Sequence, residues 1–285
     1  MPSMGSFVCH DIVIHKVLMM KKTWFTPASI AGLIVLYAAL YAWQPGGINL
    51  LKVLSDTLSV IFGLLATVLA LKASQRFEPG AASRRVWLLF GVGMVILTAA
   101  QLLWTFYHVF LSQAEPYPSP ADILWALGYV PVLGSLVLQY RALGAGTSLR
   151  LKLTVFAAYS IALIIAFVIL LWPTLSQPGQ ATAIEILVTV YYLIGDLGMA
   201  FIATLSLLVL WNSLVGRPWL YIVISMLLVA VADLMFSYGL LNDLYAIGSN
   251  LFSGVVDAVY LSAYVVAAAG AYRQVTLSLP PLNAE

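Results

Sequence analysis

Charged residues are scarce in this sequence. They make up 8% of the 285 residues, and hydrophobic residues make up 62%, whereas a soluble domain contains about 25% charged residues. Because a chain with so little polar side-chain surface cannot cover a water-facing exterior, lipid must be its solvent. We therefore expect an all-α integral membrane protein in contact with a lipid bilayer, and no nucleic-acid partner.

The residues that many membrane cofactors and catalytic sites require are also missing. Cys9 is the single cysteine, which excludes a disulfide framework and a cysteine metal site. Every lysine lies at the end of an apolar run or in a loop, so retinal has no Schiff-base partner, and only His108 lies near the membrane, which argues against a haem held by two histidines. HExxH, GxSxG and phosphate-loop motifs are absent. We expect no cofactor, no metal and no enzyme activity, although the paired aspartates described below leave a membrane hydrolase as an alternative.

What the sequence does contain is a series of apolar runs of roughly twenty residues, the length that spans about 30 Å of hydrocarbon. Residues 1–20 form a tail ahead of the first run, which lacks a signal-peptide cleavage pattern and is expected to remain as a span. The pattern predicts eight transmembrane helices, at residues 24–43, 53–74, 86–111, 121–140, 151–172, 183–211, 218–241 and 254–272.

The basic residues predict the orientation of these spans. If the N-terminus is cytoplasmic, the only cation on the outer side is Lys52. Loops on the inner side of membrane proteins are enriched in lysine and arginine, so both termini are predicted to be cytoplasmic. The cations that then lie on the inner side are Lys16, Lys21, Lys22, Lys72, Arg76, Arg84, Arg85, Arg141, Arg150, Lys152, Arg217 and Arg273.

The chain also repeats itself. "RVWLLFGVGMVILTAAQLLWTFY" from Arg85 aligns with "RPWLYIVISMLLVAVADLMFSYG" from Arg217, and the helices before and after these segments align as well. The alignment predicts two four-helix repeats, residues 21–145 and 146–273, followed by a tail, 274–285. Because each repeat has an even number of helices, both insert in the same orientation, and a pseudo-twofold axis along the membrane normal is expected. The polar pairs in this alignment are Asp56 with Asp196, Gln101 with Asp233, and Asp122 with Asp257.

These six polar residues are predicted to lie in the outer third of the membrane. Gln101 is sixteen residues beyond Arg85, or about 24 Å at 1.5 Å per residue, and the acids of the oppositely directed helices lie near the outer ends of those helices. Ionisable residues within a membrane normally face a protein interior or a wet cavity. We therefore expect an outward-facing cavity lined by acids and aromatic residues. Its candidate ligand-binding residues are Asp56, Gln101, Asp122, Asp196, Asp233, Asp257, Trp104, His108, Trp125, Tyr129, Tyr260 and Tyr264.

Two other interpretations compete with a ligand site. Ser119 and Asp122 form a capping-box pattern with Pro120 at the first helical position, so Asp122 has a structural role at its helix start. The aspartates as a group could also bond tyrosines and tryptophans on neighbouring helices and only hold the bundle together. For a ligand site, acids among aromatic rings favour a cationic or amphipathic small molecule of unknown identity.

The segment "SPADILWALGYVPVLGSL" and its second copy around Asp257 resemble the N-terminal multipass sensory region of bacterial signalling proteins, which precedes diguanylate cyclase, phosphodiesterase or histidine kinase modules. The resemblance covers roughly residues 50–272 and implies a sensory role in signal transduction at the bacterial inner membrane. The chain continues for only twelve residues after Arg273, so a role without an output domain of its own is expected. The residues that carry the resemblance are Asp122, Trp125, Gly128 and Tyr129, and in the second copy Asp257, Tyr260, Ala263 and Tyr264.

Two further functions stay open at this point. One is a transporter or channel for a cation or small amine, although matched mid-membrane prolines or glycines, which are typical of transporters, are not found: Pro131 aligns with Val266. The other is a structural accessory subunit of a larger membrane complex. A cytoplasmic or membrane signalling partner is a candidate partner for the sensory role.

Overall fold

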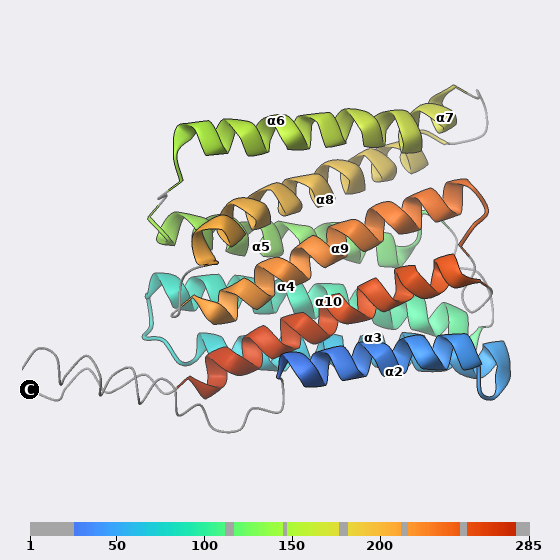
Figure 1. The fold of residues 1–285 in the computed structure, drawn as a ribbon, viewed down its shortest axis with the longest axis horizontal. Coiled ribbons are helices and arrows are strands. Elements are labelled where there is room, and N and C mark those ends of the chain that lie inside the picture. Colours follow the sequence, from blue (N-terminus) through green and yellow to red (C-terminus); the bar gives the residue numbers. More distant parts are fainter. Residues whose placement is uncertain are drawn as a thin grey trace, which may run out of the picture.

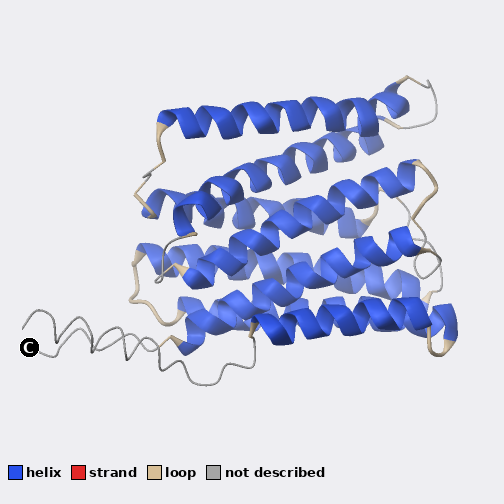
Figure 2. Ribbon diagram, in the orientation of Figure 1, coloured by secondary structure: helices blue, strands red, loops and turns tan. Residues whose placement is uncertain are grey.

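The computed structural model describes residues 26–111, 117–144, 147–176, 182–211, 216–245 and 250–277. In these residues all of the regular secondary structure is helical (Figures 1 and 2). Two short π-helical segments, η1 (Phe106–Phe110) and η2 (Phe167–Leu171), extend α4 and α6. The helices are α2 (Pro27–Trp43), α3 (Gly47–Ser74), α4 (Ala82–Thr105), α5 (Pro120–Ala142), α6 (Leu149–Ala166), α7 (Trp172–Leu175), α8 (Ala183–Leu210), α9 (Arg217–Leu241) and α10 (Leu251–Thr276).

Within the described residues, seven helical segments are long and apolar enough to cross a membrane, as in a multipass membrane protein. They are α3, α4, α5, the segment from α6 to α7, α8, α9 and α10. The remaining predicted span is the first one in the chain, and it corresponds to α2. This helix has 17 residues and is about 26 Å long at 1.5 Å per residue, slightly shorter than the hydrocarbon core. The count of eight spans therefore stays a prediction.

The start of α3 differs from the sequence prediction. It begins at Gly47, six residues before the predicted residue 53. Gln44 and Gly46 both have left-handed backbone conformations, with φ of 45° and 86°. These conformations end α2 and turn the chain sharply, and the apolar side chains after the turn continue directly into the next helix. As a result Asp56 lies more than two turns inside α3 and is not at its outer end.

Six of the helices form a closed ring. In cyclic order each of α3, α4, α5, α8, α9 and α10 packs against the next, and α10 returns to α3. Outside this ring, α2 packs against α10 and α6 packs against α8 (Figure 1). The span formed by α6 and α7 is the least buried, and α10 is the most buried. The ring is thus closed at two interfaces between the helices from α3 to α5 and those from α8 to α10, namely α5/α8 and α3/α10.

The core of the ring contains aromatic contacts between α4 and α9. The rings of Trp87 and Trp219 lie 4.9 Å apart between centroids, and those of Trp104 and Phe236 lie 6.0 Å apart. Trp87 and Trp219 are both buried. The sequence alignment pairs Trp87 with Trp219 and Trp104 with Phe236, so residues at matching positions in the predicted repeat touch each other.

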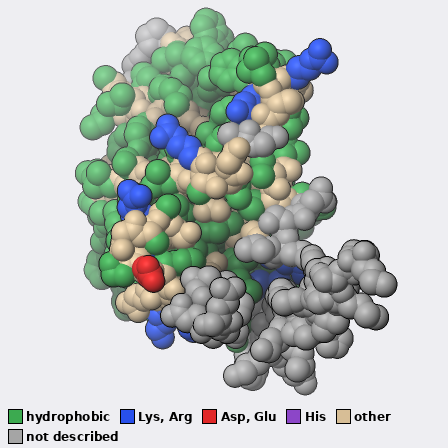
Figure 3. Space-filling model, turned by 90° about the vertical axis from the view of Figure 1, so that its left-hand side faces the viewer, with side chains coloured by type: hydrophobic (Ala, Val, Ile, Leu, Met, Phe, Trp, Pro, Cys, Tyr) green, Lys and Arg blue, Asp and Glu red, His purple; other side chains and the backbone are tan. Residues whose placement is uncertain are grey.

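One end of the bundle carries the basic loops. The connections from α3 to α4, from α5 to α6 and from α8 to α9, together with the end of α10, lie at this end. Figure 3 views it directly and shows several lysine and arginine side chains around its rim. This gathering fits the predicted cytoplasmic side, although the orientation itself stays a prediction.

Candidate functional site: an aspartate–tyrosine cluster

Four of the predicted site residues come together where α5, α8, α9 and α10 meet. We call Tyr129, Asp196, Asp233 and Tyr260 the carboxyl–tyrosine cluster. The hydroxyl of Tyr129 lies 2.5 Å from Asp196 Oδ1 and 3.1 Å from Asp233 Oδ2, and the Tyr260 hydroxyl bonds to Asp233 Oδ1. The two carboxyl groups therefore share the Tyr129 hydroxyl as a hydrogen-bonding partner. Each helix contributes one residue, so the cluster joins all four.

The cluster has more acceptor positions than hydroxyl protons. A tyrosine hydroxyl carries one proton, whereas Tyr129 lies within hydrogen-bonding distance of two carboxyl groups. Two ionised carboxylates that share one hydroxyl repel each other strongly. One additional proton on the carboxyl pair, or a cation beside it, would remove this conflict. The geometry is therefore suited to binding a small positive charge.

A glycine on α8 makes room for Tyr129. A Cβ atom built on Gly195 would lie 2.6 Å from Cδ2 of the Tyr129 ring, a distance that real contacts do not reach. The Tyr129 ring also packs against Tyr191 and Tyr192, with centroids 6.2 and 5.9 Å away. The packing of Tyr191 and Tyr192 and the space at Gly195 therefore hold the Tyr129 ring in place. In this position its hydroxyl reaches both carboxyl groups.

Asp122 has both of the roles that the sequence suggests for it. Its Oδ2 accepts a hydrogen bond of 2.7 Å from the backbone N–H of Ser119, and Ser119 Oγ accepts one of 3.3 Å from the N–H of Asp122. The predicted capping box at the start of α5 is thus confirmed. Asp122 Oδ1 also accepts a 3.0 Å hydrogen bond from the Tyr192 hydroxyl, which links α5 to α8.

The α3/α10 interface contains a second group of acids. Asp56 and Asp257 are both buried, on α3 and α10. The hydroxyl of Tyr245 donates a 2.8 Å hydrogen bond to Asp257 Oδ1 and lies near Asp56 as well. Burial and the nearby Asp257 carboxylate raise the pKa of the Tyr245 phenol well above its usual value, so this hydroxyl stays protonated and continues to donate.

The remaining predicted residues lie around the cluster with less direct roles. Trp104 on α4 packs on Trp125 of α5, with ring centroids 5.7 Å apart, and Tyr264 packs against the hydrophobic core. The backbone carbonyl of Gln101 accepts a bond from Thr105. The side chain of His108 falls outside the part of the chain that the structure describes.

Sequence analysis missed Tyr191, Tyr192, Tyr245 and Gly195, all of which shape the polar groups. A signal was available for α8: Tyr192 and Asp196 are separated by four residues and therefore lie on one face of a helix. Tyr245 lies in the segment between α9 and α10, where helical periodicity carries no information.

The predicted outward-facing cavity stays a prediction. One cavity lies between α2, α9 and α10, and none of the twelve predicted site residues lines it. Within the described residues, no group of three or more histidine, cysteine, aspartate or glutamate side chains is placed to hold a metal ion.

Comparisons with protein-family models, with curated proteins and with solved structures give no match, so the function has to be argued from the residues of this chain.

Proposed function

We propose that this chain is a non-enzymatic sensory membrane protein of the bacterial inner membrane, and that the carboxyl–tyrosine cluster is the part that responds to a small cationic ligand. The observation that carries the proposal is the position of the Tyr129 hydroxyl, which lies within hydrogen-bonding distance of carboxyl groups on two different helices. The sensory part of the proposal comes from the resemblance of the sequence to multipass sensory regions.

The location of the cluster suggests how a response would spread. Tyr129 belongs to the first predicted repeat, whereas Asp196, Asp233 and Tyr260 belong to the second. A cation that bound the carboxyl pair would compete with the tyrosine hydroxyl for the same oxygens, and any change in that bond acts across the α5/α8 interface. A ligand shifts the equilibrium between two conformations of a protein only as far as it binds one of them better than the other. The bond of the Tyr129 hydroxyl to the carboxyl pair is a contact that a bound cation would change directly.

The route to the basic end of the bundle runs along α10. Tyr260 bonds Asp233 in the outer part of this helix. At its other end the Arg273 guanidinium lies over the Tyr221 ring at 4.4 Å, and the backbone carbonyl of Val275 accepts a 2.7 Å hydrogen bond from Arg76. The helix therefore connects the cluster to residues at the surface where a signalling partner would bind.

A specific observation also favours a second candidate, a purely structural role. Several predicted site acids already have tyrosine partners, as Asp122 has in Tyr192 and Asp257 in Tyr245. Interhelical hydrogen bonds of this kind stabilise membrane bundles by about 0.6 kcal/mol on average. In that case the cluster would hold helices together in an accessory subunit and would bind nothing.

A thermal-shift titration separates the two candidates. The purified protein would be melted in mild detergent with sodium, potassium, methylammonium and tetramethylammonium chloride at constant ionic strength. A ligand present at 100 times its Kd stabilises the folded state by about 2.7 kcal/mol. We expect a shift with at least one of these cations in wild type and in Asp122→Asn, and no shift in Asp233→Asn.

The structural role predicts a different pattern. Asp233→Asn would then melt at a lower temperature than wild type, and the four cations would have equal effects on both proteins. That result would contradict the sensory proposal and direct the search toward protein partners.

A further inference from the structure

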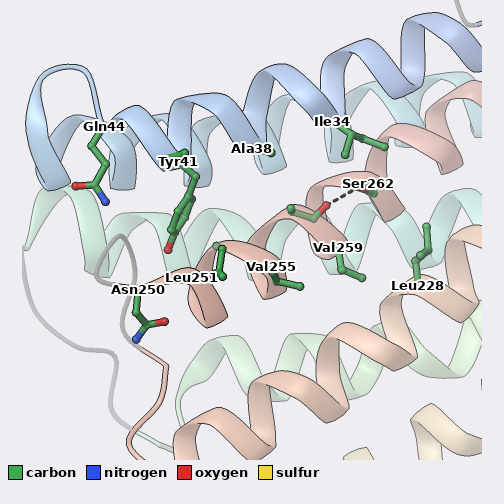
Figure 4. A pocket seen from close by; sticks show the side chains of 13 residues that line it. Ile34, Ala38, Tyr41, Gln44, Leu228, Asn250, Leu251, Val255, Val259 and Ser262 are labelled. Carbon is green, nitrogen blue, oxygen red and sulfur yellow. Dashed lines mark hydrogen bonds between the residues drawn. The ribbon is translucent and has the colours of Figure 1, made fainter.

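A groove on the lipid-facing side of the bundle lies away from the carboxyl–tyrosine cluster. It is bounded by α2, α9 and α10 and has a volume of about 430 Å³. Its walls include Ile34 and Ala38 from α2 and Leu228 from α9 (Figure 4). Lining side chains are apolar over most of its length, so water gains few hydrogen bonds inside it.

The floor of the groove is formed by α10, which contributes small residues as well as the larger Leu251, Val255 and Val259. Gly254, Ala258 and Ser262 follow one another at four-residue spacing and share one face of the helix. The hydroxyl of Ser262 donates a 2.6 Å hydrogen bond to the backbone carbonyl of Ala258. Since that bond occupies the only polar proton of the floor, the surface it presents is apolar.

One end of the groove is polar. The amide side chains of Gln44, at the end of α2, and Asn250, at the start of α10, both lie at this mouth (Figure 4). Asn250 caps α10 through its Oδ1 and donates one amide hydrogen to the carbonyl of Leu244. These two amide side chains make the mouth of the groove polar.

The length of the groove matches one leaflet of a bilayer. From Asn250 at the mouth to Ser262 is twelve residues, or about 18 Å along α10, and half of a hydrocarbon core is about 15 Å thick. The mouth lies at the end of the bundle opposite the basic loops. The groove therefore begins at the membrane surface and ends near the bilayer centre.

The volume of the groove is too small for a partner helix to enter it. A transmembrane helix about 10 Å wide and about 30 Å long fills on the order of 2,400 Å³, several times the volume of the groove. A slender apolar chain with a polar end fits instead. We infer that the groove binds one acyl chain of a glycerophospholipid from the leaflet opposite the basic loops, with the lipid headgroup region at Gln44 and Asn250.

Two alanines on α2 provide a matched pair of variants. Ala38 and Ala39 are adjacent and both exposed, but only Ala38 lines the groove. Ala38→Phe would place a phenyl group where the acyl chain lies, whereas Ala39→Phe would place the same group outside the groove. Gln44→Leu removes an amide at the mouth and leaves the walls intact.

Native mass spectrometry of protein purified through extensive detergent washing would count retained lipids. We expect one phospholipid adduct in wild type and in Ala39→Phe, and a loss of about tenfold or more in Ala38→Phe because the phenyl group and the chain cannot share the space. In Gln44→Leu we expect a smaller loss than in Ala38→Phe, of about threefold, because the mouth becomes less polar while the groove itself stays open.

Several outcomes would overturn the inference. These are a wild-type protein without a phospholipid adduct, equal retention in Ala38→Phe and Ala39→Phe, or adducts with the mass of a fatty acid or of the detergent in place of a phospholipid. If Ala38→Phe does not fold, Ala258→Leu fills the same groove from the α10 floor, and unchanged retention in that variant would contradict the inference equally.

Discussion

The α3/α10 and α5/α8 interfaces, which close the ring of helices, are built differently. At the α3/α10 interface the helices pack along each other more extensively, and buried apolar residues such as Leu51, Leu261 and Val265 form a cluster there. At the α5/α8 interface the packing is less extensive, and tyrosine hydroxyls cross it to reach Asp122, Asp196 and the Ala126 carbonyl. The comparison teaches that one interface depends mainly on apolar packing and the other on hydrogen bonds.

The predicted repeat offers a reason for the difference. Asp56 and Asp196 occupy matching positions in the sequence alignment, but the partner of Asp233 in that alignment is Gln101. An amide is neutral and can donate to a carboxylate, whereas a second carboxyl group cannot do so without a proton. On the α5/α8 side two acids share the Tyr129 hydroxyl, whereas the matching positions on the other side hold Asp56 and Gln101. The α5/α8 side is where we place the response.

The largest expected effect comes from closing the space that Tyr129 occupies. Gly195→Leu would push side-chain atoms into the Tyr129 ring, and overpacking of this kind costs about 3 kcal/mol of unfolding free energy, at the upper end of its range. Gly198 is the matched control, because a Cβ there meets no atom within 4 Å. Unfolding in a denaturing detergent would measure both, and equal stability of Gly195→Leu and Gly198→Leu would contradict the described packing.

The next effect tests the hydroxyl of Tyr129 itself. Tyr129→Phe keeps the ring but removes the donor between Asp196 and Asp233, and leaving buried acceptors unsatisfied costs about 2 kcal/mol. Tyr264, its counterpart in the predicted repeat, provides the comparison. We expect Tyr264→Phe to lower the unfolding free energy less than Tyr129→Phe does, and the reverse order would break the distinction between the two interfaces.

The smallest effect concerns the helix starts on either side of the comparison. Ser119 caps α5 and Asn250 caps α10. Replacing either residue by alanine should lower the unfolding free energy by about 1 kcal/mol, the usual contribution of an N-cap. Similar losses in Ser119→Ala and Asn250→Ala would show that the interfaces do not differ through their helix starts. If only one of the two variants lost unfolding free energy, part of the difference between the two interfaces would come from that helix start.

Much of the architecture could be predicted from the sequence because lipid requires long apolar helices. The α5 capping box was predictable as well, since its residues lie within four positions of each other. The early start of α3 was not, because it depends on left-handed backbone conformations at Gln44 and Gly46.

The contents of the site were predicted only in part. The acids stand out in an apolar sequence, and four of the twelve predicted residues form the cluster. Which hydroxyl meets which carboxyl depends on helix rotation and on the space at Gly195, and neither has a sequence signal. The placement of α2 on α10 and of α6 on α8 also departs from what two identical repeats would give.

The most direct test of the account is a distance measurement across both interfaces. In a Cys9→Ser background, spin labels would be placed at the exposed positions 127 and 194, on α5 and α8, and in a second protein at the exposed positions 53 and 251, on α3 and α10. Double electron–electron resonance would then compare each pair with and without the cation that gives the largest thermal shift. The account predicts a changed distance between α5 and α8, no change between α3 and α10, and no change at either interface when Asp233→Asn is added. Unchanged distances at both interfaces in the otherwise wild-type protein, or equal changes at the two, would contradict it.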